Sequence, residues 1–154
     1  MSGLTKDVLS VFFGGVLGTF LRLQIALLVY DYFFQGNLQS GHYLAVAMTA
    51  TLLVNVIGAF LLGALWVLYQ RGHVSGLVWR FCGIGMLGAF TTFSAYALDA
   101  FIAMKLQLWA LLSLYLAGSV LLSVLACAIG YWALGAIKPA TEKNEEITGA
   151  KDSR

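Results

Sequence analysis

Long apolar stretches separated by short polar segments run along this chain of 154 residues. A helix that crosses a lipid bilayer needs about 20 mostly apolar residues. Residues 8–30, 43–69, 77–104 and 108–136 each exceed that length and contain few charged positions. The pattern therefore predicts an all-α integral membrane protein with four transmembrane helices.

The composition favours lipid over water as the surroundings of these helices. Hydrophobic residues make up 60% of the chain and charged residues only 10%, whereas soluble domains average about 25% charged residues. A soluble domain of this size buries only about two thirds of its surface, so many apolar side chains would face water. The net charge of +2 comes without a basic stripe, so we expect no nucleic-acid partner.

The connections are short, and the composition changes after the fourth stretch. Residues 1–137 are predicted to form one transmembrane domain, and the polar residues 138–154 a disordered tail. Four spans place both termini and the second connection on one side of the membrane, together with Lys6, Arg71 and Arg80. The positive-inside rule then favours a cytoplasmic amino terminus, by a modest excess of charge.

Polar residues within the first two spans are costly and therefore indicate function. Gly14 and Gly18 form a face of small residues on which another helix can pack closely. Arg22 either extends to the lipid headgroups or gives a positive potential to a water-filled vestibule. Thr51 and Asn55 are four residues apart and share a helix face. The amide of Asn55 either joins two helices or donates hydrogen bonds to a passing anion.

The third span carries a run of glycine, threonine and aromatic residues between residues 83 and 96. Glycines followed by two threonines weaken a helix, so we predict a break near the middle of this span. Carbonyl groups freed at bilayer depth need a partner in protein or in a cavity, and a bound cation would serve. Phe90, Phe93 and Tyr96 share a helix face, which is typical of packing and also of an aromatic lining.

In the fourth span, Tyr115, Ser119, Ser123 and Cys127 recur every four residues and form a weakly polar track. Serine hydroxyls often bond the backbone of their own helix, so the track either reflects such bonds or has a role in function. The spans offer hydroxyl and amide donors, and Asp99 is the sole carboxylate between helix ends. Donors without acids favour an anion pathway, because cation carriers place acids along theirs. The sequence shows no catalytic triad, metal-ligand cluster or phosphate loop, so we expect no enzyme.

Three segments carry a family resemblance: GGVLGTFLR at residues 14–22, TLLVNVIGAFLLG at residues 51–63 and GMLGAFTTFSAY at residues 85–96. In sequence, order and spacing they resemble the signature segments of the CrcB/Fluc family of fluoride channels. The resemblance implies a passive, fluoride-selective channel in the cell (inner) membrane that exports fluoride from the cytoplasm and relieves its toxicity. It also implies an antiparallel, dual-topology homodimer with a central sodium ion that is structural and not transported.

The resemblance assigns a role to each motif position. Fluoride would pass the side chains of Thr51, Asn55, Phe93, Ser94, Tyr96, Tyr115, Ser119 and Ser123. The backbone carbonyls of Gly88 and Thr91 would hold the sodium ion, and Arg22 and Asp99 would line a vestibule or stabilise the fold.

The chain departs from the family's TTFSTF pattern, which Glu usually follows. Ala95 replaces the second Thr, Tyr96 replaces the second Phe, and Asp99 stands where Glu is usual. The added hydroxyl of Tyr96 either strengthens anion coordination or slows release. Because some members pair as different subunits, a heterodimer with a paralogous chain is a second possible arrangement.

Two other functions fit the number of spans. A small dual-topology, proton-coupled exporter of cationic compounds has this size, but such exporters depend on a carboxylate in the first helix, and residues 8–30 contain none. An assembly subunit would explain the glycine faces but would leave the broken span and the polar track without a purpose.

Overall fold

The computed structural model describes residues 3–33 and 42–135, and the regular elements within them are helices. These residues form four spans that are long and apolar enough to cross a membrane, as predicted. The first, second and fourth are α1 (Gly3–Phe33), α2 (His42–Gln70) and α6 (Trp109–Ala133). The third is divided into α3 (Gly76–Val78), the π-helical segment η1 (Trp79–Leu87), α4 (Gly88–Phe90) and α5 (Phe93–Lys105).

The helix ends differ modestly from the expected ranges. α1 extends beyond residues 8–30 at both ends, so the first connection begins later than expected. α6 ends at Ala133, before residue 136, and just past this end the amide of Gly135 donates to the carbonyl of Trp132 at 3.0 Å. The predicted tail, residues 138–154, lies outside the described residues.

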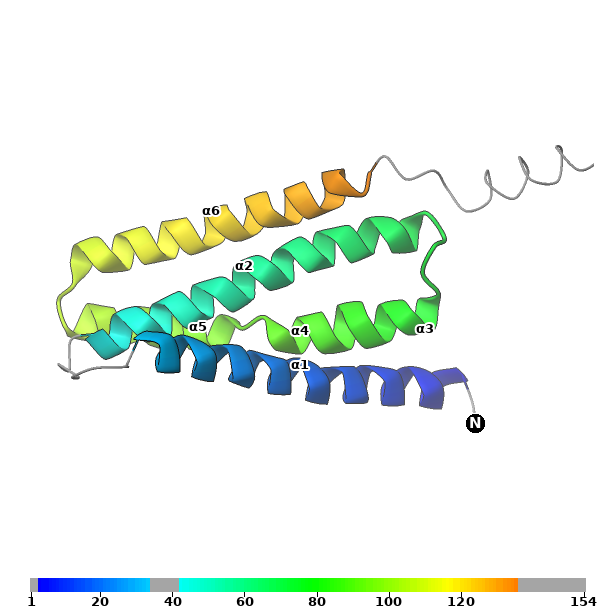
Figure 1. Ribbon diagram of the computed structural model, residues 1–154, viewed down its shortest axis with the longest axis horizontal. Coiled ribbons are helices and arrows are strands. Elements are labelled where there is room, and N and C mark those ends of the chain that lie inside the picture. Colours follow the sequence, from blue (N-terminus) through cyan, green and yellow to red (C-terminus); the bar gives the residue numbers. More distant parts are fainter. Residues whose placement is uncertain (1–2, 34–41, 136–154) are drawn as a thin grey trace, which may run out of the picture.

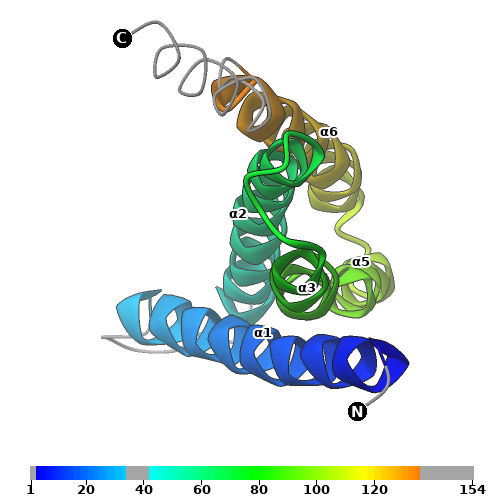
Figure 2. The same cartoon turned by 90° about the vertical axis from the view of Figure 1, so that its right-hand side faces the viewer.

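The four spans form two helix pairs. α2 packs along α6, and α1 packs along η1 and α4 (Figures 1 and 2). The start of α1, the connection from α2 to α3 and the end of α6 lie at the same end of the bundle (Figure 1). This is the arrangement that four antiparallel crossings require.

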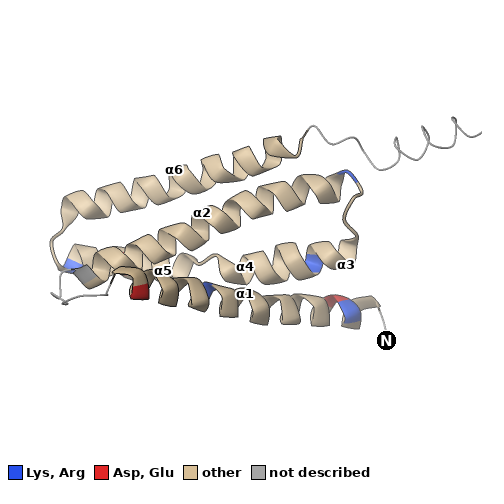
Figure 3. Cartoon of the chain, in the orientation of Figure 1, with Lys and Arg blue, Asp and Glu red and all other residues tan. Residues whose placement is uncertain are grey.

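The outside of the bundle is apolar. Among the described residues, charged positions lie mainly toward the two ends, and the long middle has few of them (Figure 3). Large hydrophobic side chains face outward, with Phe12 61% and Leu114 72% exposed. A surface of this kind suits lipid and not water, so the chain is a multi-pass membrane protein.

Glycines let α1 approach the third span at backbone distance. A Cβ atom added at Gly14 would collide with the carbonyl oxygen of Phe81, and one added at Gly18 with the carbonyl group of Met86. From the opposite side, a Cβ atom at Gly85 would collide with the backbone of Val11. The predicted small-residue face of α1 is therefore confirmed, and it places η1 against α1.

A second pair of glycines brings α2 and α6 together. A Cβ atom at Gly63 would collide with the carbonyl oxygen of Cys127, and one at Gly130 with that of Phe60. Between membrane helices, close packing of small residues replaces the hydrophobic drive that water supplies elsewhere. These contacts hold α2 and α6 in one register.

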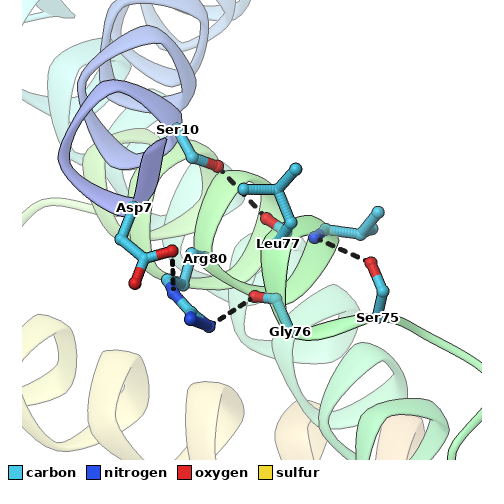
Figure 4. Close-up of polar contacts among 7 residues, drawn as sticks. Asp7, Ser10, Ser75, Gly76, Leu77 and Arg80 are labelled. Atoms are coloured by element: carbon cyan, nitrogen blue, oxygen red, sulfur yellow. Dashed lines mark hydrogen bonds and ion pairs between the residues drawn. The ribbon is translucent and has the colours of Figure 1, made fainter. Parts of the chain in front are cut away.

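A polar cluster joins the beginning of α1 to the beginning of the third span (Figure 4). Arg80 Nε lies 2.8 Å from Asp7 Oδ1, and Arg80 Nη1 donates to the carbonyl of Gly76 at 3.0 Å. Ser10 Oγ donates to the carbonyl of Leu77 at 3.1 Å. Ser75, just before α3, accepts from the amide of Val78. Backbone carbonyls at this helix end thus receive side-chain donors near the edge of the membrane.

We predict that Gly130→Ala destabilises the protein, whereas Gly118→Ala on the same helix does not. The methyl group at residue 130 would collide with the backbone of Phe60, whereas residue 118 has nothing within 4 Å of an added Cβ atom. Overpacking of this kind costs roughly 1–3 kcal/mol. Thermal unfolding of the purified proteins in detergent measures the difference, and equal midpoints for the two variants would contradict the packing described.

Candidate functional site

The third span is broken at Thr91 and Thr92, as predicted. Thr91 has ψ 154° and Thr92 has φ −147° and ψ 124°, so both depart from helical geometry. Each hydroxyl bonds the backbone of its own span: Thr91 Oγ1 donates to the carbonyl of Leu87 at 3.1 Å, beside the Thr91 amide, and Thr92 Oγ1 accepts from the amide of Ala95 at 3.2 Å. The two threonines therefore end one helix and begin the next.

Asn55 on α2 clamps the break from the side. Its Nδ2 donates to the carbonyl of Thr92 at 3.0 Å, and its Oδ1 accepts from the amide of Thr92 at 2.7 Å. A backbone amide and carbonyl at bilayer depth would be costly without such partners. Two roles were considered for Asn55, and the structure shows the one in which its amide joins two helices. That role uses one of the two N–H groups of the side-chain amide.

At the break, two backbone amides bond side chains and not the carbonyls of Gly88 and Thr91. In a continuous α-helix, the amide of residue i+4 bonds the carbonyl of residue i. The amide of Thr92, the helical partner of Gly88, donates to Asn55 instead, and the amide of Ala95, the helical partner of Thr91, donates to the Thr92 hydroxyl. Both carbonyls assigned to sodium are therefore free of their helical partners.

A groove of about 390 Å³, here called the break groove, lies beside this break. α2, the third span and α6 line it with Asn55, Ala59, Leu62, Thr91, Thr92, Phe93, Tyr96, Ser119, Val120, Ser123 and Val124. Five of the residues predicted to contact fluoride share this groove although they come from three separate spans. They are Asn55, Phe93, Tyr96, Ser119 and Ser123.

Ser119 has the most unusual environment in the break groove. Its residue is only 5% exposed, and its hydroxyl is buried without a hydrogen-bond partner. A buried hydroxyl left without a partner costs about 1–3 kcal/mol, so such groups usually have a partner. The hydroxyl of Ser119 is therefore an unpaired donor, and its side chain lines both the break groove and another groove between α2 and α6.

The break groove is also lined by two aromatic rings, those of Phe93 and Tyr96. Phe93 is 78% exposed, and its ring centroid lies 5.7 Å from that of Tyr96. The Tyr96 ring in turn lies 5.3 Å from the ring of Tyr115, and its hydroxyl donates to the carbonyl of Leu116 at 3.2 Å. Phe93 thus presents most of its ring outward from the break.

On the other side of Thr92 lies a buried polar cluster centred on Asp99. Its Oδ2 accepts from Thr51 Oγ1 at 2.9 Å and from the Tyr115 hydroxyl at 3.1 Å. Asp99 and Thr51 line a second groove of about 370 Å³ together with Arg22, and Thr92 lines both grooves. Burial of a carboxylate is tolerated here because two hydroxyls donate to one of its oxygens.

The predicted residues therefore divide into groups. Thr51, Arg22 and Asp99 face the second groove, whereas Tyr115 donates to Asp99 and does not line the break groove. Ser94 lies within hydrogen-bond distance of the Thr92 hydroxyl, 3.1 Å away. Gly88 lines a third, apolar groove with Trp66, Trp79, Cys127 and Trp132, so the polar track of α6 is divided among different surroundings.

Thr92 is the residue to which sequence reasoning gave too little weight. It belonged to the predicted break but received no role of its own, although it contacts Asn55, Ser94 and Ala95 and lies between the two grooves. A signal was present, because threonine is a favoured residue immediately before a helix.

We predict that Asn55→Leu lowers the stability of the fold as well as any transport. The change leaves the amide and carbonyl of Thr92 unpaired, at roughly 1–3 kcal/mol for each group. Thr49→Val is the matched control on the same helix, because Thr49 bonds only the carbonyl of Ala45 in its own helix. Thermal unfolding in detergent compares them. A midpoint for Asn55→Leu as high as that of the control would show that the clamp is dispensable.

Comparison with known proteins places the chain in a family. Residues 9–131 match the family described as CrcB-like protein, Camphor Resistance (CrcB). A protein of Shewanella piezotolerans named fluoride-specific ion channel FluC is 36% identical over 100 residues, covering 65% of this chain and 73% of the relative. Relatives of the same name in Phocaeicola vulgatus and Campylobacter jejuni are each 31% identical over 129 residues. Those matches cover 82% and 84% of this chain and 97% and 94% of the relatives. With most of its length matched, this chain belongs to the CrcB family.

Proposed function

We propose that this chain forms a fluoride-selective channel that lets fluoride leave the cytoplasm passively and so relieves its toxicity. The observation that carries the proposal is the buried, unpartnered hydroxyl of Ser119 beside Ser123 and Asn55 in the break groove. The names of the relatives, fluoride-specific ion channel, support the choice of ion.

The chemistry of the break groove suits a small, strongly hydrated anion. Hydroxyl and amide groups are neutral donors, and they can replace water around an ion that only accepts hydrogen bonds. The rings of Phe93 and Tyr96 add edges of positive electrostatic potential. No carboxylate is among the residues that line this groove, so nothing there repels an anion. The pathway needs no bond-making step, so we propose a channel and not an enzyme.

The second groove supplies an approach to this pathway in our proposal. Arg22 gives it positive potential, and Asp99 lines it as well, with one carboxylate oxygen accepting hydrogen bonds from two hydroxyls. Arg22 would therefore attract fluoride toward Thr92, which borders both grooves. Asp99 would serve chiefly to hold Thr51 and Tyr115 in place.

We further propose a structural sodium ion at the break. Sodium prefers oxygen ligands, and the carbonyls of Gly88 and Thr91 have lost their helical amides to Asn55 and to the Thr92 hydroxyl. These two carbonyls would hold the ion, which supplies positive charge where backbone oxygens would otherwise meet lipid. The ion would stay in place while fluoride passes.

A second copy of the chain is the proposed cover of the break groove. In a single chain, the donors of this groove and the exposed ring of Phe93 would face lipid, which offers no hydrogen bonds. An antiparallel homodimer in the cell inner membrane would enclose them. The cations near the two ends, Lys6, Arg71 and Arg80 on one side and Lys105 on the other, give a modest bias toward one orientation. That bias is compatible with a paralogous partner of fixed orientation, which is the alternative to the homodimer.

We predict that the purified protein, reconstituted in sealed vesicles, releases fluoride rapidly without a proton gradient and retains chloride. Phe93→Leu should slow the release by about tenfold or more, which corresponds to roughly 1.4 kcal/mol in the barrier, because it removes the ring edges from the groove. A fluoride electrode measures the release. Phe101→Leu, at an exposed position of the same helix outside the groove, is the control. Chloride release at a comparable rate would refute the proposed selectivity, and dependence on protons would favour the exporter of cationic compounds.

We also predict that sodium stabilises the dimer. Replacing sodium with N-methylglucamine should lower the thermal midpoint and the fraction of dimer seen by size-exclusion chromatography, because the carbonyls of Gly88 and Thr91 lose their proposed cation. Lithium and potassium at equal ionic strength separate a specific site from general screening. The same midpoint in all four salts would rule the site out.

A further inference from the structure

The hydroxyl of Tyr96 is committed to the backbone of α6. It donates to the carbonyl of Leu116 at 3.2 Å, while the ring packs between Phe93 and Tyr115. A phenol has one hydrogen to donate. In this arrangement Tyr96 offers a ring edge to the break groove, and its hydroxyl donor is not available to an ion.

The carbonyl that Tyr96 occupies lies three residues before Ser119 in α6. Serine hydroxyls in helices commonly donate to the carbonyl three or four residues earlier, which removes them from other partners. A carbonyl oxygen has two lone pairs. The helix uses one at Leu116 for the amide of Val120, and Tyr96 takes the other.

The lack of a hydrogen bond at Ser119 agrees with a competition between Tyr96 and Ser119 for the Leu116 carbonyl. Its hydroxyl is buried and makes no hydrogen bond, either to Leu116 or to the carbonyl of Tyr115 four residues before it. The side chain lines the break groove together with Tyr96. One residue of the groove therefore occupies one of the two local acceptors of another.

We propose that Tyr96 is a positioning residue: by occupying the Leu116 carbonyl, its hydroxyl withdraws one of the two local acceptors of Ser119 and so favours the state in which the Ser119 hydroxyl donates to the ion. This rests on the proposed function, in which Ser119 contacts fluoride. It also decides between the two effects considered for the added hydroxyl of Tyr96, because the gain in anion coordination comes through Ser119 and not from a direct contact.

Fluoride release from vesicles containing the full chain, measured over a range of internal fluoride concentrations, tests the proposal in a double-mutant cycle. Tyr96→Phe should raise the fluoride concentration for half-maximal release about two- to tenfold, the value of one neutral hydrogen bond. Ser119→Ala should raise it by at least as much. The double variant should match Ser119→Ala alone, because without the Ser119 hydroxyl the Leu116 carbonyl no longer matters.

The control for loss of one tyrosine hydroxyl is Tyr32→Phe, at an exposed position of α1 outside the groove, which should leave release unchanged. Losses that multiply in the double variant would overturn the proposal, since they mean that the Tyr96 hydroxyl acts on the ion or on the fold independently of Ser119. A wild-type response from Tyr96→Phe would overturn it as well.

Two further measurements keep the outcomes distinct. Thermal unfolding shows whether Tyr96→Phe still folds. If it does not, 4-aminophenylalanine at residue 96 restores a donor to the Leu116 carbonyl and should keep the wild-type half-maximal concentration, and a rise would refute the proposal. Wild-type protein that releases no fluoride would overturn the proposed function and this inference together, whereas multiplying losses in a conducting protein overturn the inference alone.

Discussion

The pairing of backbone groups at the break of the third span is the constraint on which the rest of the structure depends. Lipid supplies no hydrogen bonds, so a helix can open at this depth only if side chains replace its lost partners. Asn55 donates to the carbonyl of Thr92 and accepts from its amide. Within the third span, the Thr91 hydroxyl donates to a backbone carbonyl and the Thr92 hydroxyl accepts from a backbone amide. The break is thus a stable feature, held by a neighbouring helix.

The hydroxyl groups on the two sides of this break differ in their hydrogen bonding. On one side, Asp99 gathers the hydroxyls of Thr51 and Tyr115 into a closed cluster, so these donors are already satisfied. On the other side, Ser119 keeps a buried hydroxyl with no partner. Satisfied polar groups stabilise a fold, whereas an available donor in a groove has a cost that an occupant can remove. This contrast separates the supporting residues from those that we propose contact fluoride.

Close helix packing keeps these groups in position. Glycines at the contacts of α1 with η1 and of α2 with α6 allow the backbones to touch, and a side chain at these positions would force each pair apart. Asn55 and Ser119 lie on α2 and α6, which form one of these pairs, and the break lies on a span packed against α1. The distances across the break groove therefore follow from small residues that do not line it.

The sequence by itself determined the four spans and the broken third helix, and it singled out, as contacts for fluoride, five of the eleven residues that line the break groove. Apolar length, paired threonines and four-residue spacing are local properties that need no knowledge of neighbours. Only the tertiary structure decided three pairings: Asn55 bonds the backbone of Thr92, the Tyr115 hydroxyl donates to Asp99, and the Tyr96 hydroxyl donates to the carbonyl of Leu116. Each of these side chains has several possible partners, and which one it meets depends on the rotation and register of helices whose contacts are set by glycines far away along the chain.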